Sequence, residues 1–292
     1  MEWVYGNLQV ILDGLMTGAL YALIGMGMAL IFGVMRIVNF AHGAFLMMGM
    51  YVTFVLYDRL HLSPYIGFLV AGGLLFVFGF LTYLLVLRPL PGQESFMVIL
   101  VTMGLSLILV DASQLIFGAD YHQINIPLQS TNIHLGPHIA MNAPWLVSFG
   151  IAIAMGSAMY WFVMHTMFGR AARAVAQNRY SAPLMGINVN RVQAMAFGMG
   201  AAAAGIAGAL LLPLLYVFPE VGNQYRLKSF VMVVLGGMGS IQGAAMAGLV
   251  LGVVESLTSY YWGNEWAPVV DFVIFILVLS FRPSGIFGSQ RA

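Results

Sequence analysis

Residues 14–35 read GLMTGALYALIGMGMALIFGVM and contain no Asp, Glu, Lys or Arg. The hydrocarbon core of a bilayer is about 30 Å thick, and roughly 20 apolar residues in a helix span it. This stretch is therefore long enough to cross a membrane as a single helix. Comparable uncharged stretches recur along the rest of the chain, at 37–57, 60–87, 95–110, 144–169, 192–219 and 229–254.

These stretches are typical of helices that cross a membrane. Each is too long for a strand, and most show no alternation of apolar and polar residues, which argues against a barrel. We expect the stretch at 95–110 to continue to Phe117 with Asp111 inside it, and a shorter run at 272–281 to follow Asp271. The sequence predicts an all-α, polytopic transmembrane helix bundle with about 8–9 membrane segments and glycine-rich breaks.

The composition supports this class and excludes others. Of the 292 residues, 61% are hydrophobic and 7% are charged, whereas about 25% are charged in a typical soluble domain. The net charge of +1 provides no basic block for a nucleic-acid backbone, and a chain without cysteine holds no disulfide or Cys-ligated metal. We therefore predict one transmembrane domain over residues 1–292, solvated mainly by lipid, with no catalytic, cofactor or metal site.

The distribution of Lys and Arg predicts the orientation in the membrane, because cytoplasmic loops carry an excess of these residues. The segment 169–191 holds four arginines and is placed in the cytoplasm, whereas the loop 118–143 has no Lys or Arg and falls outside. Alternation then predicts an external N-terminus, a cytoplasmic C-terminus and about nine crossings if 229–239 crosses fully. Other basic residues fall inside at Arg36, Arg88, Arg282 and Arg291, and outside at Arg59, Arg226 and Lys228.

Small residues recur at four-residue spacing in two of the spans. Such stripes let helix backbones approach closely in lipid. Close packing within the chain is one interpretation, and an interface with another subunit is the other. The two stripes are Gly200, Ala204 and Gly208, and Ala244, Gly248 and Gly252.

Two glycine-containing breaks interrupt the apolar stretches, RIVNFAHG at 36–43 and GGMGS at 236–240. Non-helical backbone at membrane depth is tolerated only where protein or a water-filled cavity satisfies it. Glycine-interrupted segments in corresponding positions point to the substrate path of a transporter. For Asn39 and His42, the alternative is a buried, hydrogen-bonded pair that ties two helices together. The candidate path residues are Asn39, His42, Gly43, Gly236, Gly237, Gly239, Ser240 and Gln242.

Three carboxylates belong to the spans or their ends: Asp111, Glu255 and Asp271. We expect them near the outer helix ends, where they reach the interface or cap a helix. A proton-coupled transporter would need several carboxylates at mid-depth, and this placement weakens that function.

The segment 169–191 predicts two short helices outside the bilayer. Its Ala- and Arg-rich start favours a helix, Ser181 can cap a second one, and Gly186 can end it. The second helix has apolar Leu184 and Met185 to bury. A soluble subunit that docks from the cytoplasm would bury them. The alternative is a membrane-surface helix held by lipid headgroups through its arginines.

Four segments carry a resemblance to a known family. They are RIVNFAHG at 36–43 with Gly49 and Tyr51, the loop 169–190, LGGMGS at 235–240 and FRPSGIFG at 281–288. Together they resemble the LivH-type permeases of branched-chain amino acid ABC transporters, over about residues 8–288. The resemblance implies the fold of a type II-like ABC importer permease and a non-enzymatic role, which agrees with the absence of the P-loop pattern GxxxxGK[ST].

The resemblance also implies partners. The chain would join a second permease subunit of the LivM type, two cytoplasmic ATP-binding subunits and an external, periplasmic binding protein, in the cytoplasmic (inner) membrane of a bacterium. The loop is similar to the EAA-like coupling segment of the family, although Gln177 and Asn178 stand where an acidic residue is expected. The resemblance assigns the ATPase contact to Arg170, Arg173, Asn178, Ser181, Pro183, Leu184, Met185, Gly186 and Ile187.

The residues leave three other functions open. The first is a permease for urea or short amides, since selection can reside in the binding protein. The second is a stand-alone secondary transporter of small amphiphiles. The third is a membrane-embedded enzyme that uses Asp111 or His42, although the sequence offers no acid–base constellation for it.

Overall fold

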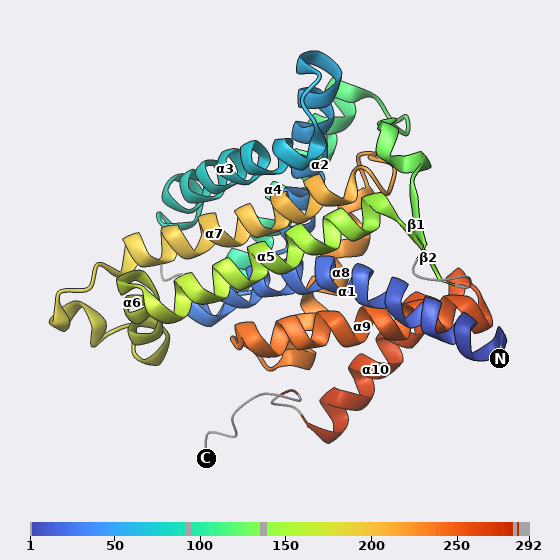
Figure 1. Ribbon diagram of the computed structural model, residues 1–292. Helices are drawn as coiled ribbons and strands as arrows, with labels where there is room; N and C mark the ends of the chain where they lie inside the picture. Colours follow the sequence, from blue (N-terminus) through green and yellow to red (C-terminus); the bar gives the residue numbers. More distant parts are fainter. Residues whose placement is uncertain (1, 91–94, 135–138, 283–284, 286–292) are drawn as a thin grey trace.

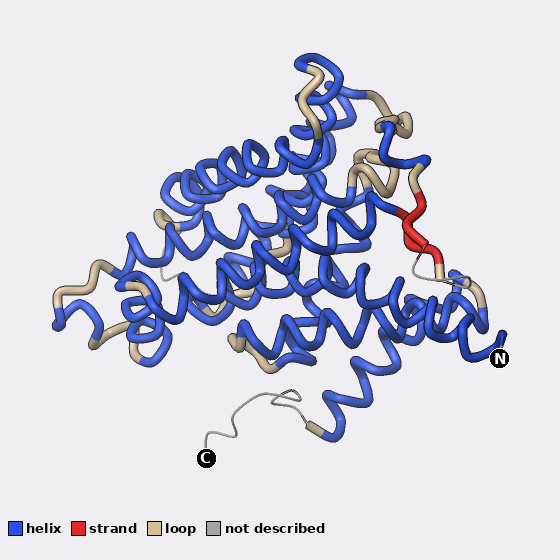
Figure 2. The backbone as a smooth tube through the Cα atoms, viewed as in Figure 1, coloured by secondary structure: helices blue, strands red, loops and turns tan. Residues whose placement is uncertain are grey.

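The computed structural model describes residues 2–90, 95–134, 139–282 and 285, which fold as a bundle of α-helices (Figure 1, Figure 2). The predicted all-α, polytopic class is confirmed. Two short strands, β1 (Asn132–His134) and β2 (Ala140–Asn142), pair antiparallel. The helices are α1 (Glu2–Met35), α2 (His42–Leu60), α3 (Pro64–Thr82), α4 (Ser95–Phe117), α5 (Ala143–His165), α6 (Met167–Gln177), α7 (Val189–Leu211), α8 (Val221–Gly236), α9 (Ile241–Trp262) and α10 (Ala267–Phe281).

Seven segments of the described chain are long and apolar enough to cross a membrane: α1, α3 with its π-helical extension, α4, α5, α7, α9 and α10. The two remaining candidates are α8, which has only 16 residues, and α2, which is more polar because it contains His42, Asp58 and Arg59. The seven segments and these two candidates make at most nine membrane segments in the described chain, which is compatible with the predicted number of about 8–9. Short 3-10 turns lie at Pro127–Ser130, Ala182–Met185 and Asn264–Trp266, and the π-helical turn is Tyr83–Leu87.

Two boundaries differ from the sequence expectation. Helix α8 begins at Val221, so Arg226 and Lys228 lie inside it and not in an outer loop. A lysine is tolerated at this depth because it has a carboxylate partner, described below. Helix α7 ends at Leu211 although the apolar stretch continues, because Pro213 lacks the N–H group that a further turn would need.

The order of packing places α1 and α7 at the centre of the bundle. Helices α3, α7, α1, α9 and α10 follow one another, each in contact with the next (Figure 1). In the most apolar stretch, 83% of residues are buried in α1 and in α7, but only 11% in the segment that contains α10. Helix α10 and the outer faces of α3 and α4 are therefore the surfaces left for lipid and partner subunits.

Glycines bring the helix backbones into direct contact. A Cβ atom on Gly248 of α9 would lie 2.4 Å from the backbone nitrogen of Ala22 in α1. On α7, a Cβ atom on Gly208 would lie 2.1 Å from the carbonyl oxygen of Leu46 in α2. Both small-residue stripes therefore serve packing within the chain, which was the first of the two interpretations.

The segments predicted on the two sides of the membrane gather at opposite ends of the bundle. At one end, Nη2 of Arg36 donates to the carbonyl oxygen of Ala176 in α6 at 3.1 Å. At the other end, Nε2 of Gln9 donates to the carbonyl oxygen of Ala140 in β2 at 2.9 Å. Figure 2 shows the strands at the end opposite to α6. This separation is what the predicted topology requires, while the side that each end faces stays a prediction.

Replacing Gly248 by Ala should lower the thermal stability of the purified protein. The new methyl group overlaps the backbone of α1, and overpacking of a filled interior costs about 1–3 kcal/mol. Thermal unfolding in detergent measures the change. Gly73→Ala is the control, because no atom lies within 4 Å of its added Cβ atom, and its Tm should be unchanged or slightly higher. Equal Tm values for the two variants would contradict the packing argument.

Candidate functional site

The first break, residues 36–41, carries the chain from the end of α1 back to the level of Ile24, where α2 begins. Nε2 of His42 lies 3.1 Å from the carbonyl oxygen of Ile24 and ties α2 to α1. The side-chain oxygen of Asn39 accepts from the N–H of Ala41 at 3.1 Å. Both side chains are fully buried, and each keeps one nitrogen without a hydrogen-bond partner in the described structure. His42 thus ties the two helices without the predicted bond to Asn39.

Helices α2 and α8 begin beside each other in the interior of the bundle. A Cβ atom on Gly43 would lie 2.0 Å from the carbonyl oxygen of Gly222, and one on Gly222 would lie 2.4 Å from that of Gly43. The N-terminal N–H groups of a helix lack intrahelical partners and carry partial positive charge. Discontinuous helices that begin inside a bundle are a common way for transporters to bind anionic groups. No sequence signal marked Gly222, which lies outside the uncharged stretches.

The second break forms a tight turn between α8 and α9. Gly237 and Gly239 both have φ of +91°, a conformation that favours glycine. The hydroxyl of Ser240 accepts from an N–H in the first turn of α9 at 3.0 Å and so caps that helix. Nε2 of Gln242 donates to the hydroxyl oxygen of Tyr160 in α5. Ser240 and Gln242 therefore serve helix capping and helix contact.

The structure does not bring the candidate path residues of the two breaks together. Gly43, at the end of the first break, lies at the start of α8, whereas the second break lies at the end of α1, where a Cβ atom on Gly33 would be 3.2 Å from the carbonyl oxygen of Gly239. Helix α8 separates them, and its 16 residues extend over about 24 Å. Asn39, His42 and Gly43 are thus one group, and the residues of the second break are another.

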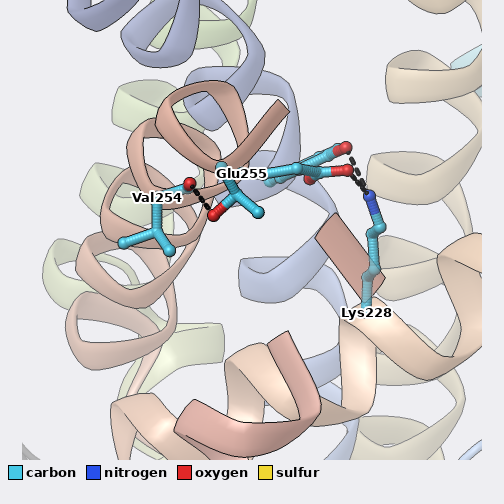
Figure 3. A network of polar contacts seen from close by, with 5 residues as sticks. Lys228, Val254 and Glu255 are labelled. Carbon is cyan, nitrogen blue, oxygen red and sulfur yellow. Dashed lines mark hydrogen bonds and ion pairs between the residues drawn. The ribbon is translucent and has the colours of Figure 1, made fainter. Parts of the chain in front are cut away.

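An ion pair that the sequence did not predict lies between α8 and α9. The side chains of Lys228 and Glu255 form a salt bridge and are only 14% and 19% exposed. Figure 3 shows the Lys228 amine directed at the Glu255 carboxylate. The same amine donates to the hydroxyl oxygen of Tyr21 in α1 at 2.7 Å. This contact joins three helices through one buried cation.

The carboxylates near helix ends divide into two kinds. Asp111 is exposed on α4, as expected for a residue that reaches the interface. Glu255 and Asp271 line a common cavity between the helices, and Asp271 is only 4% exposed, so it does not reach the interface as expected. The usable signal was Lys228, since a lysine inside a membrane segment normally pairs with a carboxylate.

The segment 169–191 folds as α6, one 3-10 turn and the start of α7. The first predicted short helix is confirmed, and the second is only a single turn. Ser181 stands at its N-cap position, but its side chain makes no capping bond. Instead, the side-chain oxygen of Asn178 accepts hydrogen bonds from the backbone N–H groups of Tyr180 and Ser181, at 2.9 and 3.0 Å. Gly186 ends the turn with φ of +77°, as predicted.

This segment holds its apolar tip in solvent and its base against α5. Leu184 and Met185 are 86% and 82% exposed, whereas Ile187 is half-buried beside α6. Nη1 of Arg173 donates to the carbonyl oxygen of Val163 at 2.6 Å, and its Nη2 to the next carbonyl at 3.3 Å. Because these carbonyls belong to the last turn of α5, Arg173 fixes α6 to the bundle.

Comparison with known proteins identifies relatives over nearly the whole chain. Residues 10–279 match the family described as "Branched-chain amino acid transport system / permease component". The high-affinity branched-chain amino acid transport permease LivH of Salmonella typhimurium is 33% identical, covering 96% of this chain and 95% of its own. The permease BraD of Pseudomonas aeruginosa is 33% identical, covering 99% of this chain and 98% of its own. LivH of Methanocaldococcus jannaschii is 27% identical, covering 96% of this chain and 92% of its own. No solved structure matches.

Replacing Arg173 by Gln should loosen α6 from α5. The change removes two charge-assisted bonds to helix-end carbonyls, and a cation in that position stabilises a helix by about 0.3–1 kcal/mol. Chymotrypsin should then cleave at the exposed Tyr180 and Leu184 several-fold faster. Arg170→Gln is the control and should be cleaved at the rate of the unchanged protein. Identical rates for all three proteins would refute the role of Arg173.

Proposed function

Since this chain belongs to the branched-chain amino acid transport system permease family, we propose that it forms the path for branched-chain or other neutral amino acids in an ATP-driven importer. The chain is a multi-pass membrane protein and a transport component, and ATP hydrolysis belongs to its partner subunits. The partners in this proposal are a LivM-type second permease, two ATP-binding subunits and an external binding protein, in the bacterial cytoplasmic membrane. The family match, which extends from α1 into α10, carries the proposal.

The segment 169–191 is the proposed contact with the ATP-binding subunits. Its support is the pair of exposed apolar side chains, Leu184 and Met185, on a turn that follows α6, the helix that Arg36 and Arg173 anchor to the bundle. An apolar tip on a fixed base suits docking into a groove of a soluble partner. The proposed contact set is Arg170, Arg173, Asn178, Ser181, Pro183, Leu184, Met185, Gly186 and Ile187.

The proposed path runs along the starts of α2 and α8 and the second break. The first group, Asn39, His42 and Gly43, would offer helix N-termini to the substrate carboxylate. The second group lies near the coupling segment, because Ile241 of α9 belongs to the same hydrophobic cluster as Val175 of α6. Movement of α6 would therefore be transmitted to the turn that holds Gly236, Gly237, Gly239, Ser240 and Gln242.

Replacing Leu184 or Met185 by Asp should uncouple the transporter. A carboxylate in an apolar contact loses its hydration without gaining a partner, which costs several kcal/mol. In proteoliposomes that contain the complete transporter, ATP-dependent uptake of radiolabelled leucine should fall at least about tenfold. The ATP-binding subunits should no longer co-purify with the permease.

Leu60→Asp is the matched control, because Leu60 is 69% exposed at the opposite end of the bundle, and it should leave co-purification intact. Normal co-purification of the Leu184→Asp protein would refute the coupling assignment alone. Gradient-driven leucine uptake by the purified chain without partners would refute the proposed function itself.

Single cysteines test the orientation, because the natural chain has none. In intact cells a membrane-impermeant maleimide should label Tyr121→Cys, at a side chain that is 68% exposed in the predicted external loop. Arg170→Cys should react only after the membrane is permeabilised. Labelling of Arg170→Cys in intact cells would invert the predicted topology.

A further inference from the structure

A charged cleft lies between α1, α8, α9 and α10, in the half of the bundle nearer to the strands. It comprises two adjoining cavities of about 390 and about 500 Å³, sizes typical of small-molecule sites. The first is also lined by Asp13 and Trp145, and the second by Lys228 and Asp271. The residues common to both cavities are Tyr21, Leu215, Tyr225, Glu255 and Asn264.

The charges of this cleft do not balance. Among the described residues that line it, Lys228 is the one cation, and Asp13, Glu255 and Asp271 are acids. Lys228 pairs with Oε1 of Glu255, but Oε2 of Glu255 and Oδ1 of Asp271 are buried without a hydrogen-bond partner in the described structure. Asp271 is 96% buried, as its exposure of 4% implies. Such an oxygen in a membrane segment is costly unless a cation or a donor binds it.

A primary ammonium group has the chemistry that the cleft lacks. It carries one positive charge and three N–H donors, enough to serve both unpartnered carboxylate oxygens. A neutral amino acid also carries a carboxylate, for which Lys228, the partner of Glu255, is the one cation among the described lining residues. Its apolar side chain would meet Leu227, Val231 and Phe272, which line the same cavity as Asp271.

We propose that Asp271, assisted by the free oxygen of Glu255, binds the α-ammonium group of the transported amino acid in the charged cleft. The substrate carboxylate then lies toward Lys228. This inference rests on the proposed function and names a binding subsite for it, separate from the starts of α2 and α8. The subsite lies beside α10, which has the smallest buried share among the seven candidate membrane spans.

Transport by the complete transporter in proteoliposomes tests the role of Asp271. Asp271→Asn should lower uptake at limiting leucine about tenfold, because a neutral amide replaces the charge that holds the ammonium group. Asp271→Glu should restore part of the uptake. Asp58→Asn is the matched control, since Asp58 is exposed on α2, and its uptake should be unchanged. Unchanged uptake by Asp271→Asn refutes the subsite while leaving the proposed function intact.

A second measurement needs no change at Asp271. Asn264 lines both cavities, and Asn264→Cys in the otherwise cysteine-free chain places one thiol at the cleft. Leucine and leucine methyl ester, which keep the ammonium group, should each slow its alkylation in the assembled transporter. The des-amino analogue 4-methylpentanoate should not. Equal protection by leucine and 4-methylpentanoate refutes ammonium recognition. Absence of ATP-dependent uptake of leucine and of the other neutral amino acids by the unchanged transporter refutes the proposed function.

Discussion

Direct contact between helix backbones is the interaction on which this structure depends. A Cβ atom on Gly18 of α1 would lie 2.9 Å from the Cα of Leu249 in α9, and one on Gly27 would lie 2.9 Å from the carbonyl oxygen of Gly200 in α7. In lipid, helices gain little from hydrophobic burial against one another, so dispersion and close approach hold them together. Glycine on both faces of α1 therefore fixes a central layer of three helices, α9, α1 and α7, before any polar contact is counted.

Beside this layer, helices α2 and α8 begin in the interior of the bundle. Helix α2 begins inside the bundle because Nε2 of His42 lies within hydrogen-bond distance of the carbonyl oxygen of Ile24 in α1 and because Gly43 allows Gly222 of α8 to approach. Backbone that is not helical must find partners within the protein when no water is present. The surrounding helices supply them, as when the hydroxyl of Thr102 in α4 accepts from the N–H of Phe40 at 3.2 Å. The non-helical segment between α1 and α2 is thus possible because neighbouring helices satisfy its polar groups.

Helix α8 connects the two functional regions. It begins beside α2, carries Lys228 into the charged cleft, and ends at the turn containing Gly237. That turn leads into Ile241, which packs in the same cluster as Val175 of the coupling segment. A displacement of α6 by a partner at one end of the bundle therefore has a continuous packed route to the cleft at the other.

The sequence alone determined the membrane class and most helices, because uncharged stretches of about 20 residues have one stable solution in lipid. It also located the turn at Gly236–Ser240 and the exposed Leu184 and Met185, since these depend on local backbone and polarity. Only the tertiary structure placed Lys228 against Glu255 and against Tyr21, 207 residues away. Such pairings depend on which helices become neighbours, and nearly uniform apolar helices carry no periodicity that specifies their neighbours.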